Sequence, residues 1–325
     1  MHPNLFAAPW LWVAFFICLG GCEDYLECPP ANPIQTGQLP SLLSQTGLYA
    51  DIEQETLADG VMEFEPAFKL WTDGADKRRW IYLPPDTQID TSDVDSWEFP
   101  VGTKVWKEFA RDGVRIETRI MERIGQGDGD WAMVSYVWDG NDAKASIRGV
   151  FDAHGTSHNV PGAGECAGCH SGRKSHVLGF SAIQLAGPDG DGPLLAQLVA
   201  DGRFSDPLPQ TMGVPGNDVE RAALGYLHAN CSHCHNNERP NIAGCFIPDN
   251  NLEFHLTASP PQDVTGTAAY RSALDNAITP GQPDNSQLIR LVSGRGVLNQ
   301  MPPLGTEMVD EVGVQLLREW VEGME

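Results

Sequence analysis

The chain has 325 residues, of which 41% are hydrophobic, so it is long enough to fold around two or three separate cores. Asp and Glu number 44 against 21 Lys and Arg, which gives a formal net charge of -23. This charge argues against nucleic acid and anionic lipid headgroups as binding surfaces, whereas it is compatible with a basic partner protein and with the solubility of an exported protein.

The first 21 residues contain no charged side chain, and residues 11–21 (LWVAFFICLGG) form an apolar run. The run is too short to span a bilayer and is typical of the core of a signal peptide. It ends in Leu19-Gly20-Gly21-Cys22, which resembles a bacterial lipobox. We therefore expect an exported bacterial lipoprotein, anchored by acyl chains on Cys22 at the periplasmic face of a membrane or at the outer membrane. An ordinary cleaved signal and an uncleaved anchor are the alternatives.

Residues 22–44 are rich in Pro, Glu and small polar residues, which predicts a lipidated tether. In residues 45–155, short runs alternate apolar with polar residues or carry aromatic and β-branched residues, and the turn sequences PPD, RDG and GQGDGD separate them. The runs are 78–83, 104–109, 114–124 and 131–138. They predict an antiparallel, sandwich-like β domain with its tryptophans in the core or on the faces of the sheet.

Helical patterns follow after residue 155. Residues 192–204 have leucines at helical spacing, and residues 217–231 predict a helix that is capped by Asn217 or Asp218. An apolar stripe of Val309, Val312, Leu316 and Trp320 predicts an amphipathic C-terminal helix. The fold class that we expect is therefore α+β and multidomain.

The pattern Cys-x-x-Cys-His occurs twice, at Cys166, Cys169 and His170, and again at Cys231, Cys234 and His235. This is the signature of covalent c-type haem attachment, in which the two thiols bind the vinyl groups and the histidine becomes the proximal iron ligand. We therefore expect two covalently bound haem c groups as cofactors. A zinc site built from the two Cys-x-x-Cys pairs would leave both histidines unexplained, and a redox-active dithiol would require a strand and helix context that the sequence lacks.

A six-coordinate haem needs a distal ligand. Met301, in the segment NQMPPLGT, follows His235 by 66 residues and precedes the C-terminal helix, which is the order of a class I cytochrome c domain. It is our candidate for the second haem. Met212, in a loop rich in Pro and Gly, is the candidate for the first haem. His158, His176, His228, Met133 and an open position compete with it.

Two cysteines lie outside the signal, the lipobox and the paired motifs. In an oxidising compartment, Cys28 and Cys245 are candidates for a disulfide, although two unpaired thiols are the alternative.

With these motifs, the chain resembles a family of exported bacterial dihaem c-type cytochromes whose members are mostly proteins of unknown role. The stretches that carry the resemblance are 69–84, 97–109, 165–170, 177–185, 226–235 and 301–306. The resemblance implies a β domain followed by α-helical, cytochrome c-like regions at 156–216 and 217–325, and it carries over the six motif residues and Met301.

The function expected from the sequence is single-electron transfer between periplasmic or surface redox protein partners. The alternative is a dihaem enzyme, either peroxidase-like or the electron-accepting subunit of a dehydrogenase, with an open site at the first haem. A third hypothesis is a binding module, in which the β domain recognises a ligand.

Overall fold

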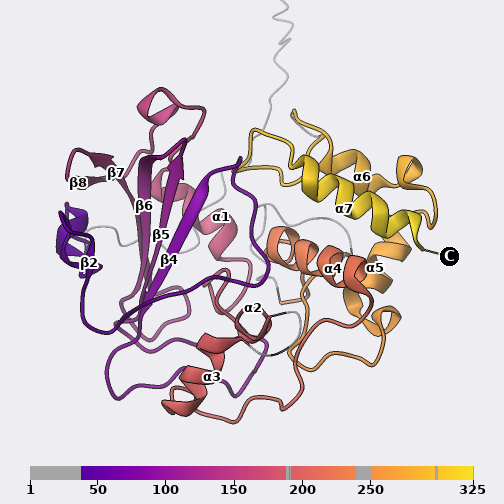
Figure 1. Cartoon of the computed structure of the whole chain (residues 1–325), viewed down its shortest axis with the longest axis horizontal. Helices are drawn as coiled ribbons and strands as arrows, with labels where there is room; N and C mark the ends of the chain where they lie inside the picture. Colours follow the sequence, from indigo (N-terminus) through magenta and orange to yellow (C-terminus); the bar gives the residue numbers. More distant parts are fainter. Residues whose placement is uncertain (1–37, 188–189, 191, 239–250, 297–298, 325) are drawn as a thin grey trace, which may run out of the picture.

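The computed structural model describes residues 38–187, 190, 192–238, 251–296 and 299–324. The sheet lies on one side of the molecule, with the short helix α1 (Cys166–His170) beside it (Figure 1). On the other side lie helices α4 (Asp218–Cys231), α5 (Ala268–Asn276), α6 (Gln287–Val292) and α7 (Glu311–Glu322). This arrangement confirms the α+β class expected from the sequence.

Six strands form one antiparallel sheet in which neighbours along the chain are neighbours in the sheet. They are β3 (Val61–Glu63), β4 (Asp76–Tyr82), β5 (Lys104–Arg111), β6 (Val114–Arg123), β7 (Trp131–Asp139) and β8 (Asp142–Ser146). The four runs predicted as strands correspond to β4, β5, β6 and β7. Successive residues of a strand point to opposite faces of the sheet, and each face of this sheet belongs to a different core. The alternating sequence patterns of the strands follow from this.

The sandwich expected for this region is not formed by the described residues. A two-stranded pairing of β1 (Tyr49–Asp51) with β2 (Thr56–Leu57) is the second sheet, and it is too small to face all six strands. Coil and a short 3-10 helix (Leu43–Gln45) cover the rest of this face of the six-stranded sheet, and Leu43 is fully buried there. Residues 38–44, expected within the tether, therefore pack on the sheet.

The two faces of the sheet contribute to two cores. On one face, Trp80, Trp106 and Trp138 pack with the segment that precedes β3. On the other face, Ile81 and Val105 pack against α2 (Ala182–Ala186) and α3 (Pro193–Ala200). The predicted core position of the tryptophans is confirmed except at Trp71, which lies half-buried in a loop.

A third core joins the C-terminal helices α4 (Asp218–Cys231), α5 (Ala268–Asn276), α6 (Gln287–Val292) and α7 (Glu311–Glu322). Asn217 caps α4, because its side chain accepts a hydrogen bond from Glu220 N at 3.0 Å. The C-terminal helix is confirmed, but its predicted stripe is partly wrong. Trp320 is buried as predicted, but Val312 is 81% exposed, and Val314 and Leu317 are buried in its place.

Candidate functional site

The first Cys-x-x-Cys-His segment forms the short helix α1 (Cys166–His170). The ring of His170 donates a hydrogen bond from Nδ1 to the carbonyl of His176 at 2.7 Å, and His176 Nδ1 donates to the carbonyl of His170 at the same distance. This pair of bonds fixes the His170 tautomer and leaves Nε2 without a proton. Burial lowers the pKa of His170 to about 3, assisted by the positive charge of Lys107. A neutral imidazole with a free Nε2 is the form that ligates iron.

The second segment continues directly from α4, as the sequence predicted. Cys231 is the last residue of the helix, and its carbonyl accepts hydrogen bonds from Cys234 N at 3.1 Å and His235 N at 2.8 Å. These bonds form one tight turn that brings both cysteines and the histidine to the end of the helix. The His235 ring packs edge-on against Phe254, with centroids 5.6 Å apart.

The two motifs touch each other, although more than sixty residues separate them in sequence. Asn236 donates from Nδ2 to the carbonyl of Gly172 at 3.1 Å and to the carbonyl of Ser232 at 2.7 Å. A Cβ atom at Gly172 would lie 1.7 Å from the carbonyl oxygen of His233. The backbone after the first motif therefore approaches the second motif closely, and only glycine fits there.

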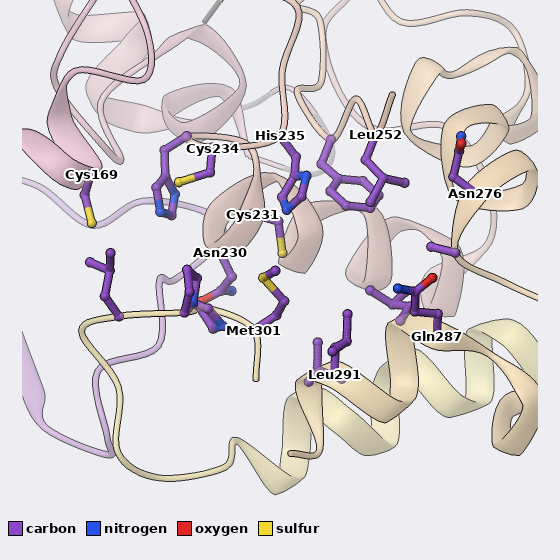
Figure 2. A pocket seen from close by; sticks show the side chains of 18 of the residues that line it. Cys169, Asn230, Cys231, Cys234, His235, Leu252, Asn276, Gln287, Leu291 and Met301 are labelled. Atoms are coloured by element: carbon purple, nitrogen blue, oxygen red, sulfur yellow. The ribbon is translucent and has the colours of Figure 1, made fainter. Parts of the chain in front are cut away.

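A cavity of about 280 Å³ opens beside the second motif. This is many times the space of about 10–15 Å³ that one water molecule needs. Cys231, Cys234, His235 and Met301 line it, and Figure 2 shows Met301 and Cys231 pointing toward each other below the His235 ring. The other side chains around it are mostly apolar, and Cys169 of the first motif lines it too. The structure thus brings together the predicted attachment, proximal and distal residues of the second site.

The loop that carries Met301 is held at several points. Met301 N donates to the carbonyl of Leu291 in α6 at 2.9 Å. Further along the loop, the Asp73 carboxylate accepts hydrogen bonds from Thr306 Oγ1 at 2.7 Å, Glu307 N at 2.8 Å and Met308 N at 3.0 Å. Sequence reasoning missed this role of Asp73.

Trp71, two residues before Asp73, also supports the loop that carries Met301. Trp71 Nε1 donates to the carbonyl of Met308 at 3.1 Å, and Trp71 N donates to Asn230 Oδ1 at 2.7 Å, just before Cys231. The Trp-rich stretch at 69–84, which was quoted above only as a mark of resemblance, thus contacts both the second motif and the Met301 loop. The turn sequence WTDG was the signal that could have drawn attention to it.

The four motif cysteines are not arranged as a disulfide or a zinc site. None of them is in a disulfide. Burial raises the pKa of Cys166 to about 11 and that of Cys231 to about 12, so both are thiols near neutral pH, unlike the activated thiolate of a redox dithiol. Among the side chains that the structure describes, no three of the His, Cys, Asp or Glu type are gathered as metal ligands.

The first motif has a less complete surrounding. Cys166 and Met212 both pack against the sheet-side core, and no contact between Met212 and His170 is described. All three competing histidines have a partner for a ring nitrogen: His158 Nε2 lies 2.7 Å from Glu117, His228 Nδ1 accepts from Leu256 N at 3.1 Å, and His176 Nδ1 donates to the carbonyl of His170. Met212 therefore stays a prediction.

The predicted signal peptide at 1–21, the lipidation site Cys22 and the candidate disulfide between Cys28 and Cys245 lie outside the described residues. Of the helices that the structure describes, none has the length and apolar character needed to cross a bilayer. Comparisons of the chain with protein-family models, with curated proteins and with solved structures find no match.

Proposed function

We propose that the protein is a dihaem c-type cytochrome that passes single electrons between redox protein partners outside the bacterial cytoplasm. Thioether bonds would link one haem to Cys166 and Cys169 and the other to Cys231 and Cys234. His170 and His235 would be the proximal ligands. The helical part would comprise two cytochrome c-like haem regions, at 156–216 and 217–325, and lipidation of Cys22 would tether the chain to a membrane.

One observation carries the proposal. Cys231, Cys234, His235 and Met301 come from two segments far apart in sequence, yet they line a single mostly apolar cavity. These are the two thiols, the imidazole and the thioether that a six-coordinate haem c requires. A zinc site or a redox dithiol would have no use for the methionine or for the apolar walls.

The bound group would supply the one-electron chemistry of iron, and the chain would set its conditions. Met301 is a soft ligand that favours the reduced metal, which raises the potential. The apolar walls exclude water, so that little solvent reorganises when the charge changes. The hydrogen bond from His170 Nδ1 to the carbonyl of His176 makes the imidazole a better donor at the first site.

The contact between the motifs supports transfer within the molecule. Asn236 and Gly172 join the two segments, and Cys169 of the first motif lines the cavity of the second. The residues that would hold the two haems are therefore close together in the fold, which suits a carrier that connects two partners.

A potentiometric titration monitored by absorbance and EPR tests this function. The proposal predicts two one-electron steps and two low-spin signals per chain. A chain that carries haem but shows no reversible redox step, or that exchanges no electrons with small redox proteins, would contradict it. A stoichiometric high-spin haem would favour the alternative, a dihaem enzyme of the peroxidase or dehydrogenase-subunit type with an open first site.

A further inference from the structure

Three cations lie directly opposite one another across the sheet. Arg79 on β4 pairs in register with Lys107 on β5, which pairs in register with Arg119 on β6. Lys77 lies two residues before Arg79 and therefore on the same face. We call these four residues the cationic row. Like charges directly opposite in a sheet repel each other, so the row destabilises the sheet unless something neutralises it.

The row is only partly exposed to water. Arg79 is 5% exposed, Lys77 and Lys107 are half-buried, and the Arg119 side chain is 32% exposed. Burial, together with the charges of the other basic residues of the row, lowers the pKa of Lys77 to about 6 and that of Lys107 to about 7. A buried guanidinium such as that of Arg79 costs several kcal/mol of stability unless a counter-charge is present, which points to an anion on this face.

The described residues do not supply enough negative charge. Glu117 pairs with Arg119, with Nη2 to Oε1 at 2.5 Å and Nε to Oε2 at 3.0 Å. Lys107 donates only to a carbonyl, that of Leu178 at 2.9 Å, and Lys77 likewise donates to the carbonyl of Leu70. Within the described chain, the Arg79 guanidinium makes no side-chain hydrogen bond and no ion pair, and Glu65 is the acidic residue whose charge acts on it. Four basic side chains thus face one buried carboxylate.

Arg119 and Lys107 are the residues of the row nearest the first motif, and Arg79 lies farther from it. Arg119 is close enough to act on the pKa of Cys166 and of Cys169, and Lys107 acts on those of Cys169 and His170. The charge of Arg79 is not among the causes that shift the pKa values of Cys166, Cys169 and His170. Helix α1, which carries the first motif, lies beside the sheet in Figure 1. From β6 to β4 the row spans two strand spacings, about 10 Å.

We infer that the cationic row binds the two propionate carboxylates of the tetrapyrrole attached at Cys166 and Cys169. This inference rests on the proposed function. The thioether and propionate edges of a haem c lie on opposite sides of the macrocycle, so its carboxylates would lie away from Cys166 and Cys169, and Arg79 and Lys77 would be the residues of the row available to hold them. The planar guanidinium of Arg79 matches a carboxylate through two parallel hydrogen bonds.

The row also has a consequence for electron transfer. Reduction adds one negative charge to the haem, and cations nearby stabilise the reduced form. The first haem would therefore have a higher potential than the same ligands would give in a neutral site. The sheet, on this account, sets the potential of one haem and is more than a scaffold.

The experiment compares the full-length haem protein with its Arg79→Gln variant. Arg78→Gln is the matched control, because Arg78 is the next residue on the same strand, points to the other face and pairs with Glu55 and Glu63. Both midpoint potentials are measured by spectroelectrochemistry, and haem content by the pyridine haemochrome method. In Arg79→Gln we expect one potential to fall by at least a tenfold change in the redox equilibrium constant, which is 59 mV for one electron. The control should change by less than threefold.

Two further measurements guard against a variant that fails to fold. Arg79→Lys should keep the potential at pH 5, where a lysine in this row carries its charge, because the pKa values of Lys77 and Lys107 are lowered only to about 6 and about 7. In the unchanged protein, the propionate bending bands of the resonance Raman spectrum should have the frequency of hydrogen-bonded carboxylates, and added phosphate should not shift the potential. Three results, each obtained with two haems per chain, would overturn this inference alone. They are propionates without hydrogen bonds, no shift of potential in Arg79→Gln, and a potential that responds to phosphate. A chain without covalent haem would overturn the proposed function as well.

Discussion

Asp73 accepts a hydrogen bond from Thr306 at 2.7 Å, although 233 residues separate the two in sequence. Asp73 has a left-handed backbone (φ 53°), which aspartate tolerates better than most residues, and its carboxylate also accepts from the next two backbone amides of the loop. Because Thr306 follows Met301 by five residues, the loop before β4 holds the segment that carries the candidate iron ligand.

Replacing Asp73 with Ala removes three hydrogen bonds to the Met301 loop. We expect the free energy of unfolding to fall by about 2–4 kcal/mol, since bonds to a charged group are each worth about 1.5–3 kcal/mol and are only partly additive. The Met-to-iron charge-transfer band should weaken, while the amount of covalent haem stays the same. Asp76→Ala is the control, because Asp76 is exposed three residues further on. An unchanged band in Asp73→Ala would show that the loop needs no such support.

Met301→Ala should abolish the Met-to-iron charge-transfer band and lower the potential of one haem, because a soft thioether stabilises ferrous iron. Met308→Ala is the matched control from the same loop, where the side chain is 42% exposed. Absorbance spectra and potentiometry of both variants check this. If the band survives in Met301→Ala, another residue is the ligand.

Gly172→Ala places a Cβ atom 1.7 Å from the carbonyl oxygen of His233, so the two motif segments must separate. We expect a loss of more than about 3 kcal/mol of stability, because the clash is with backbone and no flexible side chain can yield. Gly164→Ala should be nearly neutral, since nothing lies within 4 Å of its added atom. Thermal denaturation of the two variants makes the comparison, and equal melting temperatures would refute the close contact.

The buried carboxylate of Glu117 predicts an acid dependence. Burial raises the pKa of Glu117. The charge of Arg119 and the hydrogen bonds from His158 and Arg119 lower it by more than burial raises it, so the pKa lies below its ordinary value. Such a group stabilises the fold above its unfolded pKa, about 4.3, and this contribution is lost as the pH falls through the folded pKa. Glu117→Gln should be less stable at pH 7 by about 3–5 kcal/mol and lose less on acidification.

Urea denaturation at pH 7 and at several pH values below 4.3 measures both effects. Glu122→Gln is the control from the same strand, where the carboxylate is 25% exposed and 3.9 Å from Lys104. Parallel pH profiles for Glu117→Gln and the unchanged protein would contradict the assignment.

Local patterns in the sequence were sufficient for most elements. The strands from β4 to β7 were predicted because alternation of apolar and polar residues depends on the strand alone. Helix α4 was predicted from its cap at Asn217 and its spacing. The exposed face of α7 was not, because Val312 is apolar, and only the packing of Val314 against the other helices decides which side is covered.

Non-local relationships were beyond the sequence. Met301 was placed with His235 only through the order typical of a cytochrome c domain. Nothing in the chain indicated that Asp73 would contact Thr306 or that Gly172 would contact His233, since these contacts depend on how separate segments dock. The absence of a sandwich among the described residues has the same cause, because alternation shows that both faces of the six-stranded sheet are covered but not what covers them.

The central claim is that each Cys-x-x-Cys-His segment holds one covalent haem. The most direct test expresses the full chain, including the predicted export signal, in a bacterial host that attaches c-type haem, and measures intact mass and pyridine haemochrome. The account predicts two haems per chain, one in a Cys166→Ala/Cys169→Ala variant and one in a Cys231→Ala/Cys234→Ala variant. Folded protein with no attached haem, or with a haem count unaffected by both pairs of substitutions, would contradict it.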